Sequence, residues 1–205
     1  MKQHIPNVLT YARLVLCLVM FAGFGFLAAG VVGRPVPVPA DLLTATIVAT
    51  FVLAAVTDFF DGYLARKWGV VSMTGAILDP IADKVLVCGA ILGICAVATA
   101  PEIVMAGGVI LFREFAISAL REVLAPKGIK LPVTFLAKTK TTLQLVAITA
   151  LMVTVFWRAW DPDGFDGLDT ALGAAKGLFL FAAVVTVWTG FEYAMEARKA
   201  LRRDI

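Results

Sequence analysis

Six long runs of apolar residues dominate the chain, at roughly 8–32, 41–65, 80–100, 103–124, 138–159 and 170–195. A helix needs about 20 apolar residues to cross the hydrocarbon core of a bilayer, and each run is about that long. Proline-rich and glycine-rich stretches separate the runs, for example at residues 33–39 and 161–164. Because proline cannot continue a helix, these stretches mark connections. The pattern predicts an all-α integral membrane protein with six transmembrane helices, forming a single domain over residues 1–205.

Basic residues gather on one side of the predicted membrane. That side holds Lys2, Arg66, Lys67, Lys127, Lys130, Lys138, Lys140, Arg198, Lys199, Arg202 and Arg203, and the other side has Arg34 and Arg158. Loops rich in lysine and arginine stay in the cytoplasm, so both termini are expected there, in the cell's inner membrane. The opposite face carries four acids, which we interpret as part of a solvated loop: Asp161, Asp163, Asp166 and Asp169.

The composition agrees with a membrane protein and narrows its chemistry. The 205 residues are 60% hydrophobic and 16% charged, with a net charge of +3, whereas about a quarter of a soluble domain is charged. A single histidine, His4, argues against a histidine-rich metal site or a Ser-His-Asp triad. The three cysteines lie in apolar runs and suggest no pairing. Membrane lipids are expected partners, and nucleic acid is not.

Four aspartates interrupt this apolar chain near the cytoplasmic ends of the second and third predicted helices. Asp58 and Asp61 are three residues apart, and Asp79 and Asp83 are four apart. Each pair therefore shares one face of a helix. The third helix is expected to begin near Pro80, with the preceding glycines turning the chain back. All four carboxylates would then meet in one pocket.

Such a pocket requires positive charge, because unpaired carboxylates in a low dielectric repel one another. Arg66 and Lys84 are too few and do not converge on it. Oxygen ligands favour Mg²⁺, Mn²⁺ or Ca²⁺ over Zn²⁺, and Mg²⁺ held by carboxylates commonly binds substrate phosphate as well. Two simpler interpretations stay open at this point: charges at helix ends in headgroup water, or a pathway for protons or divalent cations.

The spacing of these residues is specific. The run reads Asp58-x2-Asp61-Gly62-x2-Ala65-Arg66-x8-Gly75-x3-Asp79-x3-Asp83. It resembles the complete signature of the CDP-alcohol phosphotransferases. The resemblance implies a six-span enzyme, commonly a homodimer. Such enzymes transfer a phosphatidyl or related group from a CDP-linked donor to an alcohol and release CMP.

The resemblance also implies roles for the residues of the run. Asp58, Asp61, Asp79 and Asp83 would hold two Mg²⁺ or Mn²⁺ ions, and Asp83 would be the general base. The donor nucleotide would be bound by Asp58, Gly62, Ala65, Arg66 and Gly75. Residues 5–13 are similar to the P-N-x-L-T-x-x-R opening of many family members, with Asn7 and Thr10 bordering the nucleotide and Arg13 closing the motif.

A second polar cluster indicates the chemical class of the acceptor alcohol. Arg113 and Arg121 lie two turns apart in the fourth run. Arginine within an apolar run is costly unless it faces a polar cavity or an anion. Glu114 is out of helical register with Arg113, so we expect no simple ion pair between them. At the start of the fifth run, Lys138, Lys140 and Thr141 suit phosphate binding at a helix N-terminus.

These basic residues favour a phosphorylated acceptor. The REF…SALRE run (113–122) and the K-x-K-T-x-x-Q run (138–144) resemble the phosphatidylglycerophosphate synthase branch, which uses CDP-diacylglycerol and sn-glycerol 3-phosphate. A phosphatidylinositol-phosphate synthase is the alternative within the family. A divalent-cation transporter is the alternative outside it, although spans three and five carry almost no polar residues toward the outer face. Gly89-x3-Gly93 would let two helices approach closely.

Overall fold

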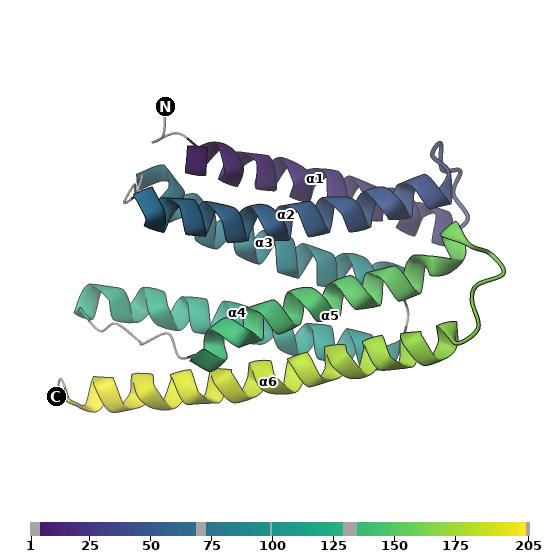
Figure 1. Ribbon diagram of the computed structural model, residues 1–205. Helices are drawn as coiled ribbons and strands as arrows, with labels where there is room; N and C mark the ends of the chain where they lie inside the picture. Colours follow the sequence, from purple (N-terminus) through teal and green to yellow (C-terminus); the bar gives the residue numbers. More distant parts are fainter. Residues whose placement is uncertain (1–4, 69–72, 99, 129–134, 204–205) are drawn as a thin grey trace.

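Six long helices make up the described part of the chain, and no strand occurs within it (Figure 1). The computed structural model describes residues 5–68, 73–98, 100–128 and 135–203; side chains of residues 5, 6, 61–68, 73, 74, 76, 135–138 and 203 are outside this description. The helices are α1 (Ile5–Val31), α2 (Ala40–Trp68), α3 (Met73–Val97), α4 (Pro101–Leu124), α5 (Phe135–Trp160) and α6 (Leu168–Arg203). A short 3-10 turn, η1 (Ala125–Lys127), follows α4.

All six helices contain a stretch long and apolar enough to cross a membrane, which confirms the predicted span number. The bilayer interior offers no water to the backbone, so helical hydrogen bonding within each run is the stable solution. α6 has 36 residues, which corresponds to about 54 Å at 1.5 Å per residue. It is therefore longer than the roughly 30 Å hydrocarbon core requires.

The predicted start of the third helix at Pro80 is wrong. α3 begins at Met73 and continues through Pro80, so Gly75 lies inside a helix and not in the predicted turn. A proline removes one backbone donor, and here the helix continues on both sides of it. The shared face of Asp79 and Asp83 is therefore continuous helix.

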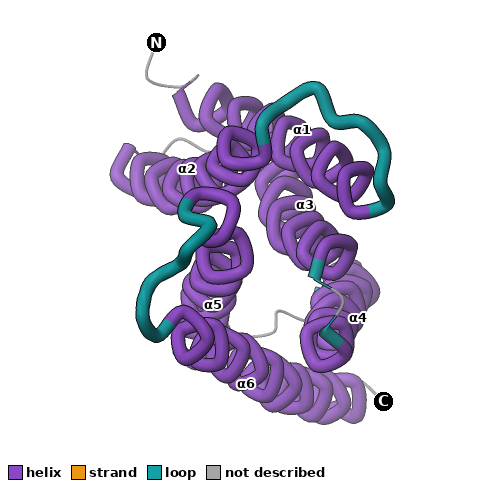
Figure 2. Tube along the Cα trace, turned by 90° about the vertical axis from the view of Figure 1, so that its right-hand side faces the viewer, coloured by secondary structure: helices purple, strands orange, loops and turns teal. Residues whose placement is uncertain are grey.

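The helices form two groups of three that face each other (Figure 2). α1 packs on α2 and α3, and α6 packs on α4 and α5. Contacts of α2 with α5 and of α3 with α4 join the two groups. α1 begins and α6 ends at the same end of the bundle, at the left of Figure 1. An even number of spans requires this arrangement.

One apolar core runs between the helices and includes the fully buried Phe51 and Phe179. Gly89 and Gly93 of α3 face it, and a Cβ on either would overlap the rings of Phe21 and Phe24 of α1. The Gly-x3-Gly pair therefore brings α3 close to α1 within the chain.

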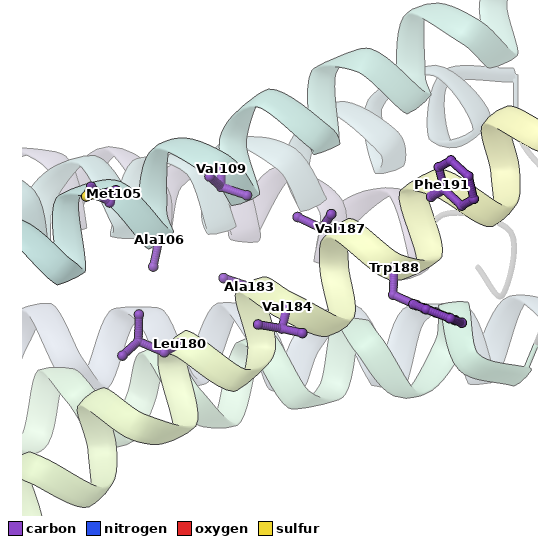
Figure 3. A pocket seen from close by; sticks show the side chains of 9 residues that line it. All are labelled: Met105, Ala106, Val109, Leu180, Ala183, Val184, Val187, Trp188 and Phe191. Carbon is purple, nitrogen blue, oxygen red and sulfur yellow. The ribbon is translucent and has the colours of Figure 1, made fainter.

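A groove of about 540 Å³ lies between α4 and α6 (Figure 3). It is lined by Met105, Ala106, Val109, Leu180, Ala183, Val184, Val187, Trp188 and Phe191. None of these side chains is ionisable, and the indole N–H of Trp188 is bonded to Glu192 at 2.9 Å. This groove therefore has no group that could bind a phosphate.

Candidate active site

A polar cavity of about 680 Å³ lies toward the end of the bundle where α1 begins. Five helices contribute to its lining. The lining residues are Ala55, Asp58 and Phe59 of α2; Pro80, Asp83 and Lys84 of α3; Arg113, Glu114, Ile117, Ser118 and Arg121 of α4; Lys140, Thr141, Thr142 and Leu145 of α5; and Tyr193 of α6. The fold thus brings two of the sequence-predicted aspartates to the same space as most of the predicted basic cluster.

Asp58 and Asp83 form the acidic wall of this cavity, and Asp79 lies one turn before Asp83 on α3. Asp58 of α2 and Asp83 of α3 line the same space, so these two helices each bring one carboxylate to it. The side chain of Asp61 is outside the described residues. Among the side chains that are described, no three acidic, histidine or cysteine groups are close enough together to hold a metal ion.

Two residues of α1 reach this acidic wall. Arg13 is fully buried, and its Nη1 lies 2.5 Å from Oδ1 of Asp58. Thr10 is also buried, and its hydroxyl donates a 2.6 Å hydrogen bond to Oδ1 of Asp79. The start of α1, which includes the half-buried Asn7, therefore lies beside the aspartates.

Arg13 is a site residue that the sequence reasoning left without a role. An arginine within an apolar run was the signal, since a buried guanidinium needs an anionic partner. Like Arg113, Arg13 is a buried arginine that lies against a carboxylate.

The expectation that Arg113 does not pair with Glu114 is wrong. Nη1 of Arg113 lies 3.3 Å from Oε1 of Glu114, and Nη2 donates to the Thr189 hydroxyl at 3.2 Å. Adjacent residues diverge around a helix, but both side chains are long enough to meet at its edge. Arg113 is 9% exposed, and such burial favours pairing.

Lys140 joins the same carboxylate from α5. Its Nζ forms an ion pair with Oε1 of Glu114, and the lysine is 4% exposed. Gln144, one turn further, donates to the Thr186 hydroxyl at 2.8 Å. Thr141 lines the cavity beside them. Lys138, the remaining predicted member of the cluster, has its side chain outside the described residues.

Arg121 completes this basic wall through a contact with α6. Its Nη2 donates to the phenol oxygen of Tyr193 at 3.1 Å. No feature of the sequence distinguished Tyr193 from the other aromatic residues of the last span. Lys84 and Ser118 also line the cavity and were not predicted as site residues.

Four of the residues predicted to bind the donor nucleotide lie where α2 ends and α3 begins. Gly62, Ala65 and Arg66 lie in the last turns of α2, although their surroundings are outside the description. Gly75 is buried in the first turn of α3. Both segments are continuous with the acidic wall.

Comparison with known proteins identifies the family. The sequence profile of the CDP-alcohol phosphatidyltransferases matches residues 3–188. The chain belongs to this family. It is accordingly a membrane-embedded transferase of phospholipid biosynthesis, as the aspartate run predicted.

Several relatives share most of the chain's length. Proteins from Rickettsia bellii and Pectobacterium atrosepticum are each 37% identical, over 96% and 98% of this chain and 97% and 98% of their own. A protein from Cereibacter sphaeroides is 46% identical over 75% of this chain and 65% of its own. All three are named CDP-diacylglycerol–glycerol-3-phosphate 3-phosphatidyltransferase.

The cavity of this CDP-alcohol phosphatidyltransferase has two chemically distinct walls. The acidic wall, with Asp58 and Asp83, can bind cations and accept a proton. The basic wall, with Arg113, Arg121 and Lys140, can bind an anion. An anionic substrate on the basic wall would have its other end close to the carboxylates.

Proposed function

We propose that this enzyme transfers the phosphatidyl group of CDP-diacylglycerol to sn-glycerol 3-phosphate, giving phosphatidylglycerophosphate and CMP. One observation carries the proposal: the basic wall, in which Arg113 and Lys140 are buried, lines the same cavity as Asp58 and Asp83. The names of relatives that align over nearly the whole chain support it.

The charge of the basic wall suits the phosphate of the acceptor. Arg113, Arg121 and Lys140 supply three positive charges and Glu114 one negative charge, which leaves a net charge of +2. A phosphate monoester carries roughly −1.5 to −2 at pH 7. Because Arg113 and Lys140 are buried, their attraction for this anion is screened less than it would be at a surface. We assign acceptor-phosphate binding to Arg113, Arg121, Lys138, Lys140 and Thr141.

The aspartates suit the binding of divalent metal ions. Asp58, Asp61, Asp79 and Asp83 supply oxygen atoms alone, which Mg²⁺ and Mn²⁺ prefer. Asp58 and Asp83 line one cavity and Asp79 lies one turn before Asp83 on α3, which supports a shared site with Asp61 as the fourth member. Two such ions, when bound, would neutralise charge on the donor pyrophosphate and on the departing CMP.

Donor binding and proton transfer are carried out by different residues of the chain. Asn7, Thr10, Asp58, Gly62, Ala65, Arg66 and Gly75 bind and orient the CDP end of the donor. Asp83 accepts the proton of the acceptor hydroxyl. The freed oxygen bonds to the phosphatidyl phosphorus, and the bond from that phosphorus to the CMP oxygen breaks. CMP leaves with the bonding electron pair, and Asp83 later releases its proton to water.

The chain would act as a homodimer of single domains in the inner membrane. The excess of lysine and arginine at the end of the bundle that holds the cavity supports a cytoplasmic site. Glycerol 3-phosphate and the charged head of CDP-diacylglycerol would then reach the cavity from the cytoplasm.

The test is CMP release by the purified protein in lipid with CDP-diacylglycerol and Mg²⁺. Glycerol 3-phosphate, inositol phosphate, serine and glycerol are compared as acceptors, and we expect turnover with glycerol 3-phosphate. Turnover with inositol phosphate instead would keep the aspartate chemistry and refute the acceptor. Ion flux in proteoliposomes without CDP-lipid, and no CMP release, would favour a transporter.

A further inference from the structure

The ring of Tyr193 lies against both arginines of the basic wall. The Cζ atoms of Arg121 and Arg113 are 5.1 and 5.7 Å from its centroid. The phenol oxygen accepts a hydrogen bond from Arg121 at 3.1 Å. Tyr193 and Arg113 are 2% and 9% exposed, so the contact between them forms away from water, whereas Arg121 is exposed.

The side chains of Arg113 and Arg121 converge on the ring of Tyr193 from separate turns of α4. Arg113 and Arg121 are eight residues apart on α4, about 12 Å along the helix axis. Both heads nevertheless lie within 5.7 Å of the same centroid. Two like charges this close repel each other, and the negative face of an aromatic ring offsets part of that repulsion.

A single face of α6 supports the basic wall. Thr186 accepts a hydrogen bond from Gln144, and Thr189 accepts one from Arg113. Gly190 leaves room for the arginine, because a Cβ there would lie 2.9 Å from Cγ of Arg113. Tyr193 continues this face one turn further, so α6 orients the side chains of α4 and α5.

We propose that Tyr193 is a positioning residue for the acceptor: its ring holds the guanidinium groups of Arg113 and Arg121 together so that both bind one phosphate. This inference rests on the proposed function. Without the ring, repulsion separates the two groups, and Arg113 keeps its pairing with Glu114 instead. The acceptor then binds less tightly, whereas the donor, which is bound by residues of α1, α2 and α3, is unaffected.

The experiment compares Tyr193→Leu, Tyr193→Phe and the control Phe191→Leu in lipid. Phe191 is 63% exposed on the apolar groove of the same helix. We measure kcat and the KM values for glycerol 3-phosphate and for CDP-diacylglycerol. Tyr193→Leu should raise the KM for glycerol 3-phosphate about tenfold, since the loss of a desolvated cation–π contact, here the one with Arg113, is enough for such a change. The KM for CDP-diacylglycerol should stay within about twofold.

Tyr193→Phe keeps the ring and loses the hydrogen bond to Arg121, so its KM for glycerol 3-phosphate should lie between wild type and Tyr193→Leu. A cycle with Arg121→Ala supplies a second test, because a residue that acts through Arg121 gives less than additive effects on this KM. A structural role alone would alter both KM values or the amount of folded protein.

The outcomes separate the two proposals. If the wild type does not use glycerol 3-phosphate, the proposed function fails and the role of Tyr193 fails with it. If the wild type does use it and Tyr193→Leu has an unchanged KM, only the role of Tyr193 is refuted. If Tyr193→Leu does not fold, Tyr193→Met decides, because methionine also removes the ring and fills irregular gaps well. A KM for glycerol 3-phosphate equal to wild type in that variant overturns the proposal, and a raised KM for this substrate alone supports it.

Discussion

The guanidinium group of Arg13 in α1 lies against the carboxylate of Asp58 in α2, with Nη1 2.5 Å from Oδ1. This contact links the opening motif of the chain to the aspartate run more than forty residues later. Thr10 makes the same connection to Asp79 one turn earlier. The first helix is therefore part of the acidic wall and not merely a membrane anchor.

Removing Arg13 should impair both activity and stability. Arg13→Ala leaves the Asp58 carboxylate without its ion pair, and truncating one partner of a buried pair costs roughly 3–5 kcal/mol. Asp58 is 37% exposed on its side chain, so we expect a smaller loss of about 1–3 kcal/mol. CMP release should fall at least tenfold, and the melting temperature should drop.

The matched control is Arg158→Ala, which removes an exposed arginine at the far end of the bundle, 3.7 Å from Asp169. The rate of CMP release and the melting temperature of this variant should both stay near those of the wild type. Normal CMP release by Arg13→Ala would show that the pair with Asp58 is dispensable.

Asp83→Asn should nearly abolish turnover. The amide cannot accept the acceptor's proton, and loss of a general base costs roughly 10²–10⁴ in rate. CMP release measures turnover, and the thermal shift on adding CDP-diacylglycerol measures donor binding, which should largely persist. Asp163→Asn, on the exposed loop before α6, is the control. A near-normal rate for Asp83→Asn would assign the base to another residue.

Lys140→Ala should act mainly on the acceptor. The lysine is buried in the basic wall beside Glu114, and a charged hydrogen bond is worth about 1.5–3 kcal/mol. The KM for glycerol 3-phosphate should rise roughly tenfold or more, with a smaller change in kcat. Lys127→Ala removes an exposed lysine of η1 and should leave the KM unchanged. An equal KM in both variants would place the acceptor phosphate elsewhere.

Chelation should stop the reaction reversibly. EDTA is expected to abolish CMP release, and excess Mg²⁺ or Mn²⁺ should restore it, because four carboxylates favour hard divalent ions. Zn²⁺ should restore it poorly. Full activity after exhaustive chelation would mean that the aspartates work without a metal ion.

The sequence by itself determined the six helices and predicted which aspartates share a helix face. Six apolar runs predict six helices, because a backbone in hydrocarbon must satisfy its own hydrogen bonds. Helical spacing then places Asp58 near Asp61 and Asp79 near Asp83 without any knowledge of packing. The cationic residues within apolar runs, such as Arg113, were also recognisable, since burial of an unpaired charge is too costly.

The tertiary structure decided which helix faces meet. Faces that contact lipid and faces that contact another helix are almost equally apolar, so sequence pattern does not separate them. Gly89 and Gly93 therefore predicted close packing but not α1 as the partner. Arg13 and Asp58, or Tyr193 and its two arginines, belong to helices that are distant in the chain. Their contacts follow from the packing of the six helices, which apolar periodicity alone leaves undetermined.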